Sequence, residues 1–136
     1  MAAPEPVQRI LIAEDDPSVL KMTRLRLQHE GFEVIVAVNG EEAVTKATAD
    51  PTIRLILLDL RMPKLNGLEV CQRLKDRPET SGIPIIIFTA SSISWQRLTD
   101  QCIEVGVSDW LKKPFRSEEL LMRIRRALEK GGGKHG

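Results

Sequence analysis

The chain has 136 residues, the length of one ordinary domain, and its 42% hydrophobic and 29% charged residues are typical of a soluble globular protein. Its 20 basic and 19 acidic residues leave a formal net charge of +1, so no overall field would concentrate nucleic acid or an anionic membrane. Only 4% of the residues are aromatic, which excludes a base-stacking platform and an aromatic sugar cleft.

The two cysteines, Cys71 and Cys102, each lie in a stretch that is expected to be helical. We interpret them as small core residues and not as a disulfide, a redox pair or half of a metal site, because the sequence has no C-x-x-C and no histidine near either. Residues 1–8 do not resemble a signal peptide, and the longest apolar runs are far shorter than the roughly 20 residues that span a bilayer. We therefore expect a cytoplasmic protein without membrane insertion.

The first predicted strand is the apolar run Ile10–Ala13, which is typical of a strand buried on both faces. An acidic stretch, residues 14–16, follows it directly. Asp16 is expected to cap a helix that has Pro17 at its first position and ends at Gly31.

A second strand is predicted over Phe32–Val38, followed by Asn39-Gly40. This dipeptide is compatible with a hairpin turn, but residues Glu41–Ala49 are helix formers with little strand character. We therefore expect Asn39 to cap a second helix, which ends before Pro51.

The same alternation continues to the end of the chain. Strands are expected over Leu55–Leu58, Pro84–Phe88 and Val107–Leu111. Helices are expected over Gly67–Lys75, over 93–105 and from Ser117 onward. The second of these helices has Trp95, Leu98, Cys102 and Val105 on one face. Strands and helices that alternate through short connections predict a parallel sheet with helices on both faces, a doubly wound α/β fold. One domain over 9–130 is expected, between a disordered segment 1–8 and a flexible tail 131–136.

Polar side chains stand where the predicted strands end. Glu14 and Asp15 follow the first strand, Asp59 the third, Thr89 the fourth and Lys113 the fifth, and in such sheets ligands bind beyond the carboxyl ends of the strands. Three carboxylates at one edge repel one another unless a cation neutralises them. Oxygen ligands without histidine or thiolate favour Mg²⁺, with Mn²⁺ as an alternative, and the lysine and threonine suit phosphoryl oxygens.

Three of these residues have a structural alternative. Asp15 could belong to a helix cap, Lys113 could be a solvated lysine before a turn, and Thr89 could be a turn or strand residue. Asp59 is the sharpest candidate, because it precedes a loop with no helix start beside it. The five residues together favour one site.

Four motifs carry a resemblance to a known family. These are Glu14-Asp15 after Ile-Leu-Ile-Ala, Asp59 within Leu-Leu-Asp-Leu-Arg-Met-Pro-Lys-Leu-Asn-Gly, Thr89-Ala90 after Pro-Ile-Ile-Ile-Phe, and Lys113-Pro114-Phe115. With them the chain resembles the receiver domain of bacterial two-component response regulators, of the CheY-like, stand-alone kind, from about Arg9 to Leu128.

The resemblance implies a flavodoxin-like fold with strand order 2-1-3-4-5 and a phosphoacceptor at Asp59, which takes a phosphoryl group from a sensor histidine kinase or a histidine phosphotransfer protein. It implies Mg²⁺ bound by Asp15, by Asp59 and by the backbone carbonyl of Arg61, with Glu14 reaching the ion through water. Such a domain phosphorylates and dephosphorylates itself, and it is a signalling switch and not a turnover enzyme.

The resemblance also implies how the switch operates. Thr89 moves toward the phosphoryl oxygens, and the aromatic residue of the fifth strand, Trp110 here, rotates inward; a static packing role for Trp110 is the alternative. The output surface is the face formed by the last two helices and the fifth strand, offered to an unknown downstream protein by a monomer or an activation-dependent dimer. Because no output domain follows in this sequence, no direct contact with nucleic acid is expected, although a chain excised from a longer regulator is equally compatible.

Four arginines are expected on that output face: Arg116, Arg123, Arg125 and Arg126. They are either a docking patch for an acidic partner or an ordinary solvated helix surface.

Three rival functions remain for the whole domain. A Mg²⁺-dependent aspartyl phosphatase would have a second aspartate two residues after Asp59, where Arg61 stands. A pseudo-receiver would lack some of the acidic or lysine residues that are present here. A nucleotide- or flavin-binding domain would need a glycine-rich loop after the first strand, where Glu14-Asp15-Asp16-Pro17 stands instead.

Overall fold

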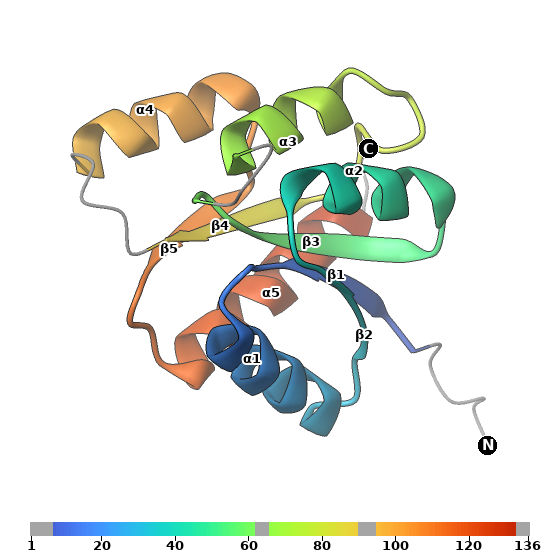
Figure 1. Cartoon of the computed structure of the whole chain (residues 1–136), viewed down its shortest axis with the longest axis vertical. Coiled ribbons are helices and arrows are strands. Elements are labelled where there is room, and N and C mark those ends of the chain that lie inside the picture. Colours follow the sequence, from blue (N-terminus) through green and yellow to red (C-terminus); the bar gives the residue numbers. More distant parts are fainter. Residues whose placement is uncertain (1–6, 62–65, 90–94, 133–136) are drawn as a thin grey trace.

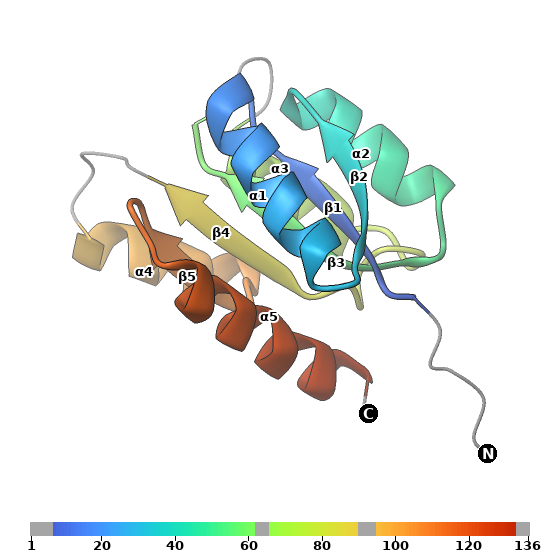
Figure 2. The ribbon, with the colours of Figure 1, turned by 90° about the horizontal axis from the view of Figure 1, so that it is seen from below.

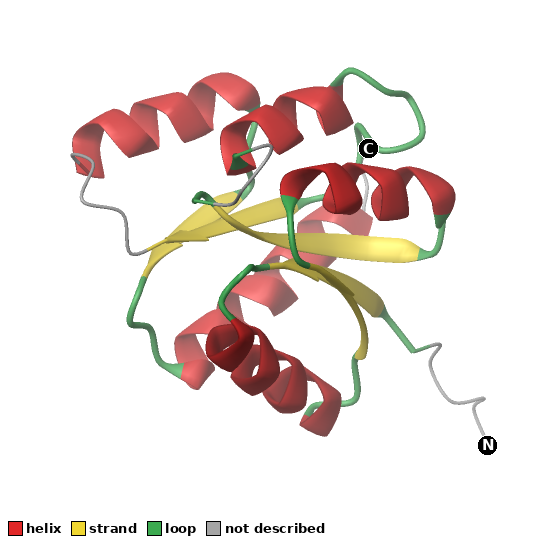
Figure 3. Cartoon of the chain, viewed as in Figure 1, coloured by secondary structure: helices red, strands yellow, loops and turns green. Residues whose placement is uncertain are grey.

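The computed structural model describes residues 7–61, 66–89 and 95–132. Strands and helices alternate along these residues (Figures 1 and 3). The elements are β1 (Arg9–Ala13), α1 (Pro17–His29), β2 (Glu33–Ala37), α2 (Gly40–Ala49), β3 (Ile53–Asp59), α3 (Gly67–Lys75), β4 (Ile85–Thr89), α4 (Trp95–Val105), β5 (Asp109–Lys112) and α5 (Ser117–Gly132). The order of elements expected from the sequence is confirmed.

The five strands form one parallel sheet in the order β2-β1-β3-β4-β5. Helices α1 and α5 cover one face of this sheet, and α2, α3 and α4 cover the other, as Figures 1 and 2 show from two directions. This is the doubly wound, flavodoxin-like arrangement that the sequence predicts.

Both faces of the central strands are buried, which explains their continuous apolar runs. In β1, Leu11 and Ala13 belong to the core beneath α2 and α3, whereas Ile10 and Ile12 belong to the core beneath α1 and α5. Side chains of Leu55–Leu58 in β3 divide between the same two cores and are fully buried. The long apolar runs therefore stabilise the sheet at its centre.

Capping residues and a left-handed glycine fix where the first two helices begin and where α1 ends. The Asp16 carboxylate accepts a hydrogen bond of 2.9 Å from the Ser18 N–H at the start of α1, and Asn39 accepts one of 2.8 Å from the Glu42 N–H at the start of α2. Gly31 follows α1 with a φ of +93°, a left-handed conformation that favours glycine. The predicted caps and the predicted end of α1 are confirmed.

Some boundaries differ from the prediction. Thr89 is the last residue of β4 and not the first residue after it. Strand β5 begins at Asp109 and not at Val107. The chain turns at Gly106, which has a φ of +79°, and Val107 is buried in the connection between this turn and the strand. Helix α5 extends to Gly132, past the expected domain boundary at residue 130.

The cysteine and membrane predictions can be compared with the same structure. Cys71 lies in the core beneath α2 and α3 with no exposed surface, as predicted. The side chains of Trp95, Leu98 and Cys102 lie outside the described residues, so the predicted α4 stripe is represented only by Val105, which is partly buried against that core. In the part of the chain that the structure describes, no helix has the length and apolar character needed to span a bilayer.

Candidate functional site

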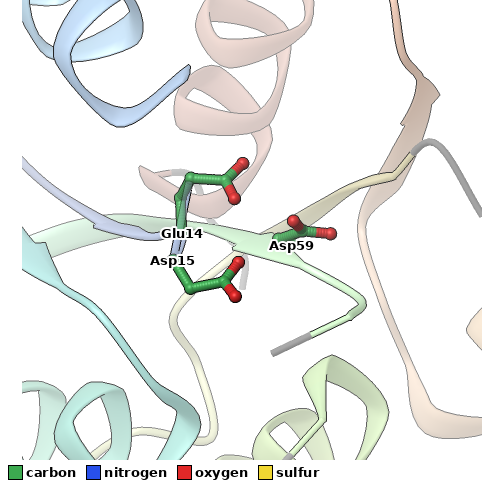
Figure 4. Close-up of side chains that lie close together, drawn as sticks. All are labelled: Glu14, Asp15 and Asp59. Carbon is green, nitrogen blue, oxygen red and sulfur yellow. The ribbon is translucent and has the colours of Figure 1, made fainter. Parts of the chain in front are cut away.

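Three carboxylates meet at the carboxyl end of the sheet (Figure 4). Glu14 and Asp15 follow β1, and Asp59 ends the neighbouring strand β3; one carboxylate oxygen from each lies within 4.8 Å of the others. Glu14 is fully buried and Asp59 is 6% exposed, whereas Asp15 is exposed. The parallel pairing of β1 with β3 brings together residues that lie about 45 positions apart in the sequence.

A lysine lies between two of these carboxylates. The Nζ atom of Lys113 is 2.7 Å from Oε1 of Glu14 and 3.2 Å from Oδ2 of Asp59. The Lys113 side chain is 16% exposed, so water screens these ion pairs only partly. One ammonium facing three carboxylates leaves the cluster with an excess of negative charge.

The pKa of Glu14 reflects this crowding. Its pKa is raised to about 7: burial of the carboxylate is the largest cause, and the neighbouring Asp59 adds to it, against the lowering effects of Lys113 and of the Asp16 N–H at 3.1 Å. Burial also lowers the pKa of Lys113, but the ion pairs with Glu14 and Asp59 outweigh it, and the net shift is upward. Lys113 therefore stays charged, while Glu14 favours a proton or a nearby cation.

Thr89 completes the edge of the site. The preceding residue, Phe88, lies opposite Asp59 in the pairing of β3 with β4. Thr89 itself is 2% exposed. The Thr89 carbonyl accepts a 2.9 Å hydrogen bond from the Lys113 N–H. The structure thus brings Glu14, Asp15, Asp59 and Lys113 together and places Thr89 beside them.

The loop after Asp59 is held close to the site by its backbone. The Arg61 N–H donates a 3.1 Å hydrogen bond to Oδ1 of Asp59, and the Gly67 N–H donates one of 2.9 Å to the Leu60 carbonyl. A Cβ atom on Gly67 would lie 2.8 Å from the Asp59 backbone oxygen and 2.9 Å from Cα of Leu60. Only glycine allows this approach, and the sequence analysis did not predict this requirement.

A second missed residue is Phe88. The Lys113 ammonium lies over its ring, 5.0 Å from the ring centroid. The sequence contains a signal for it, because Phe88 is the aromatic residue in the otherwise aliphatic strand that ends at Thr89.

Trp110 lies on the edge strand β5, where its Cα partner is Ile87. Its side chain is partly buried against the core beneath α2 and α3, and its backbone N–H donates a 2.9 Å hydrogen bond to the Asp109 carboxylate. The candidate switch residue is thus on the strand that leads to Lys113.

Two of the four arginines of the candidate output face form ion pairs with different elements. Arg123 forms ion pairs with Asp109 of β5 at 2.5 Å and with Glu119 at 3.3 Å. Arg125 instead pairs at 3.1 Å with Glu30, which caps the end of α1. Arg123 and Arg125 both lie on α5, but Arg123 pairs with β5 and Arg125 with the end of α1.

A comparison with protein families decides the assignment. The family model for the response regulator receiver domain matches residues 10–125. The chain is a response regulator receiver domain. The family that the sequence motifs indicated is therefore confirmed, and the domain belongs to the signalling switches of two-component systems and not to the turnover enzymes.

Curated relatives of this receiver domain are response regulators. Response regulator ArlR of Staphylococcus saprophyticus is 38% identical over 122 residues, which cover 90% of this chain and 53% of that protein. The DNA-binding response regulator MtrA of Mycolicibacterium smegmatis is 37% identical over 123 residues, which cover 90% of this chain and 51% of MtrA. The chain thus spans about half the length of these relatives.

Solved structures of receiver domains have the same fold. The receiver domain of the sensor histidine kinase PA1611 of Pseudomonas aeruginosa, with a magnesium ion in its active-site cleft, has a TM-score of 0.83 and 29% identity, covering 92% of this chain and 100% of that one. Chemotaxis protein CheY4 of Vibrio cholerae has a TM-score of 0.82 and 30% identity, covering 90% of this chain and 99% of that one.

Proposed function

We propose that Asp59 accepts a phosphoryl group from a phosphohistidine on a sensor histidine kinase or a histidine phosphotransfer protein. The observation that carries this proposal is the position of the Asp59 carboxylate: it ends the central strand β3, is almost buried, and lies 3.2 Å from the Lys113 ammonium beside two further carboxylates. A carboxylate with a fixed cation and a candidate metal site at hand is suited to in-line phosphoryl transfer.

The transfer exchanges one bond for another. An Asp59 carboxylate oxygen forms a bond to phosphorus, the bond from phosphorus to the histidine nitrogen breaks, and its electron pair returns to the imidazole. In the dephosphorylation step, a water oxygen forms a bond to phosphorus and the bond from phosphorus to the Asp59 oxygen breaks. The carboxylate is regenerated, and the water oxygen leaves as part of inorganic phosphate, with the water protons going to phosphate or solvent. We propose that the domain promotes both steps by positioning and charge.

The donor set supports a divalent ion, Mg²⁺ or alternatively Mn²⁺. Asp15, Asp59 and the Arg61 carbonyl would hold it, and Glu14 would contact it through water, because hard cations prefer oxygen ligands. Among the described residues, Lys113 forms the ion pairs with Glu14 and Asp59, and one ammonium does not balance the charge of three carboxylates. When bound, the ion would neutralise charge on the phosphoryl oxygens.

Lys113 and Thr89 are proposed to stabilise the other phosphoryl oxygens. Lys113 supplies a fixed positive charge at the edge of the site, and Thr89, buried at the end of β4, supplies a hydroxyl group. Movement of Thr89 toward the phosphoryl group and rotation of Trp110 are then proposed to alter the face formed by α4, β5 and α5.

We propose that the face formed by α4, β5 and α5 contacts a downstream protein. The domain would do so as a monomer or as a dimer formed on activation. We propose a cytoplasmic domain over residues 9–132, to the end of α5, that acts without direct contact to nucleic acid. Among the relatives, MtrA is a DNA-binding regulator of about twice this length, so a DNA-binding function would belong to a region outside this match.

The proposal is tested by labelling with acetyl phosphate. We expect the protein to gain one phosphoryl group on Asp59 when Mg²⁺ is present and none in EDTA, as measured by intact mass and peptide mapping. Asp59→Asn should abolish labelling, whereas Asp76→Asn, at the exposed end of α3, should retain it. Undiminished labelling of Asp59→Asn would overturn the assignment.

A further inference from the structure

We propose that Phe88 is a positioning residue that holds the Lys113 ammonium in the acidic site through a cation–π contact. This inference rests on the proposed function of Lys113 at the phosphoryl group. It extends the site to an aromatic residue that none of the sequence motifs marks as functional.

The contact has the geometry of a cation–π interaction. The Lys113 Nζ atom lies over the Phe88 ring at 5.0 Å from the centroid, within the roughly 6 Å over which a ring attracts an ammonium. Phe88 is 1% exposed and the Lys113 side chain 16%. Because little water separates or screens the two groups, the attraction is stronger than at an exposed surface.

Neighbouring residues fix the orientation of the ring. Phe115 contacts it edge to face, with centroids 5.9 Å apart and ring planes at 80°. Phe115 lies two residues after Lys113, so the same short segment supplies the ammonium above the ring and the brace at its edge. The strand register adds the third constraint, because Phe88 is the Cα partner of Asp59 on one side and of Leu111 on the other.

Core packing alone does not require an aromatic residue at this position. The three residues before it in β4, Ile85–Ile87, are fully buried isoleucines that fill the sheet. An aliphatic residue at position 88 would bury apolar surface as well, but it would offer the ammonium no negative face. The aromatic ring makes two contacts that an aliphatic side chain would not, with the Lys113 ammonium over its face and with the ring of Phe115 at its edge.

The ring also does something that the carboxylates do not. Glu14 and Asp59 attract Lys113 from one side, with the shorter contact, 2.7 Å, to Glu14. Their attraction is shared with any other cation that binds the carboxylates, whereas the attraction of the ring face does not depend on them. Phe88 would thus keep the ammonium at the site while the charges around it change.

The contact can be measured directly by NMR without metal or phosphodonor. A ring below the ammonium shifts the Lys113 ε-methylene proton signals upfield, and we expect this shift to be lost in Phe88→Leu. Phe32→Leu is the matched control, since Phe32 packs partly buried against the same core but precedes β2 at the other end of the sheet. Unchanged Lys113 signals in Phe88→Leu would overturn the contact.

The effect on the reaction is tested with an isosteric ring. Replacing Phe88 by trifluorophenylalanine keeps the shape and removes most of the negative charge of the ring face. We expect the maximal rate of labelling by acetyl phosphate to fall about three- to tenfold, with an unchanged half-saturating concentration of the donor. The same replacement at Phe32 should leave both unchanged, and equal rates for the two fluorinated proteins would overturn the inference.

Lys113→Ala separates this inference from the proposed function. If Lys113→Ala slows labelling and fluorination at position 88 does not, the role of Phe88 is wrong and that of Lys113 stands. If Lys113→Ala leaves the rate unchanged, the proposed role of Lys113 fails, and with it the catalytic consequence of the Phe88 contact.

Discussion

Lys113 makes its shorter ion pair with Glu14, at 2.7 Å, and its longer one with the proposed phosphoacceptor Asp59, at 3.2 Å. Glu14 is fully buried, so it is more than the outer, water-mediated metal ligand that the family resemblance implies. It anchors the lysine at the site, and its own charge is expensive in the absence of a partner. This relationship makes Glu14 a residue through which pH acts on the stability of the domain.

The first prediction concerns stability and pH in the presence of EDTA. The pKa of Glu14 is raised to about 7 in the folded domain, from an ordinary value of 4.5, so the folded state holds the proton more tightly than the unfolded state. This stabilisation is complete below about pH 4.5 and is lost as the pH rises to about 7. We expect a loss of about 3–4 kcal/mol at most, because the pKa rises from 4.5 to about 7 and each pKa unit corresponds to roughly 1.4 kcal/mol.

Urea denaturation at a series of pH values measures this loss. The difference in the free energy of unfolding between the wild type and Glu14→Gln should change over this pH range, because the amide does not titrate. Glu79→Gln, at an exposed position, is the control and should follow the wild type. Parallel curves for wild type and Glu14→Gln would contradict the prediction.

The second prediction concerns metal binding. If Glu14, Asp15 and Asp59 repel one another without a cation, Mg²⁺ should stabilise the wild type, by about 2.7 kcal/mol at a hundredfold excess over its Kd. Thermal melts at pH 8 should show a clear rise in Tm for the wild type and for Asp76→Asn. The rise should be small for the double variant Asp15→Asn with Asp59→Asn, and an equal rise in all three proteins would refute the metal site.

Much of this fold could be predicted because its signals are local. The apolar runs of β1 and β3, the cap at Asp16 and the cap at Asn39 are each visible in a few neighbouring residues. The site was predictable for a different reason: parallel strands end at one edge, so residues that follow them, such as Asp59 and Lys113, must come close together.

What could not be predicted depends on side-chain direction and close packing between distant segments. The Lys113–Glu14 pair joins residues 99 positions apart, and its preference over Asp59 depends on the side-chain conformations. Helical periodicity could not indicate that Arg125 pairs with Glu30, 95 positions away. The need for glycine at position 67 arises only when α3 and the loop after β3 meet.

The third prediction concerns that glycine. In Gly67→Ala the new methyl group meets the Asp59 oxygen at 2.8 Å and the Leu60 Cα at 2.9 Å. Both are backbone atoms, so α3 or the end of β3 must move. We expect a loss of about 1–3 kcal/mol in the free energy of unfolding and slower labelling of Asp59. Gly82→Ala is the control, because nothing lies within 4 Å of the added methyl group, and equal stability of the two variants would contradict this account.

The last prediction concerns Trp110. Its backbone is tied to β5 and α5, because its N–H donates to the Asp109 carboxylate, which Arg123 holds at 2.5 Å. We therefore expect the response of this residue to phosphorylation to be a movement of its partly buried indole. Trp110 is the sole tryptophan in a Trp95→Phe variant, whose emission consequently reports on this side chain alone.

We expect the emission of Trp95→Phe to shift to shorter wavelength when acetyl phosphate and Mg²⁺ are added, because inward rotation removes the indole from water. The same variant carrying Asp59→Asn should not respond, which separates phosphorylation from binding of the donor or the metal. An unchanged spectrum in the protein that mass spectrometry shows to be phosphorylated would mean that Trp110 is a static packing residue. In that case the signal would have to reach the face of α4, β5 and α5 through Thr89 and the backbone of β4. The Thr89 carbonyl accepts a hydrogen bond from the Lys113 N–H, directly after β5.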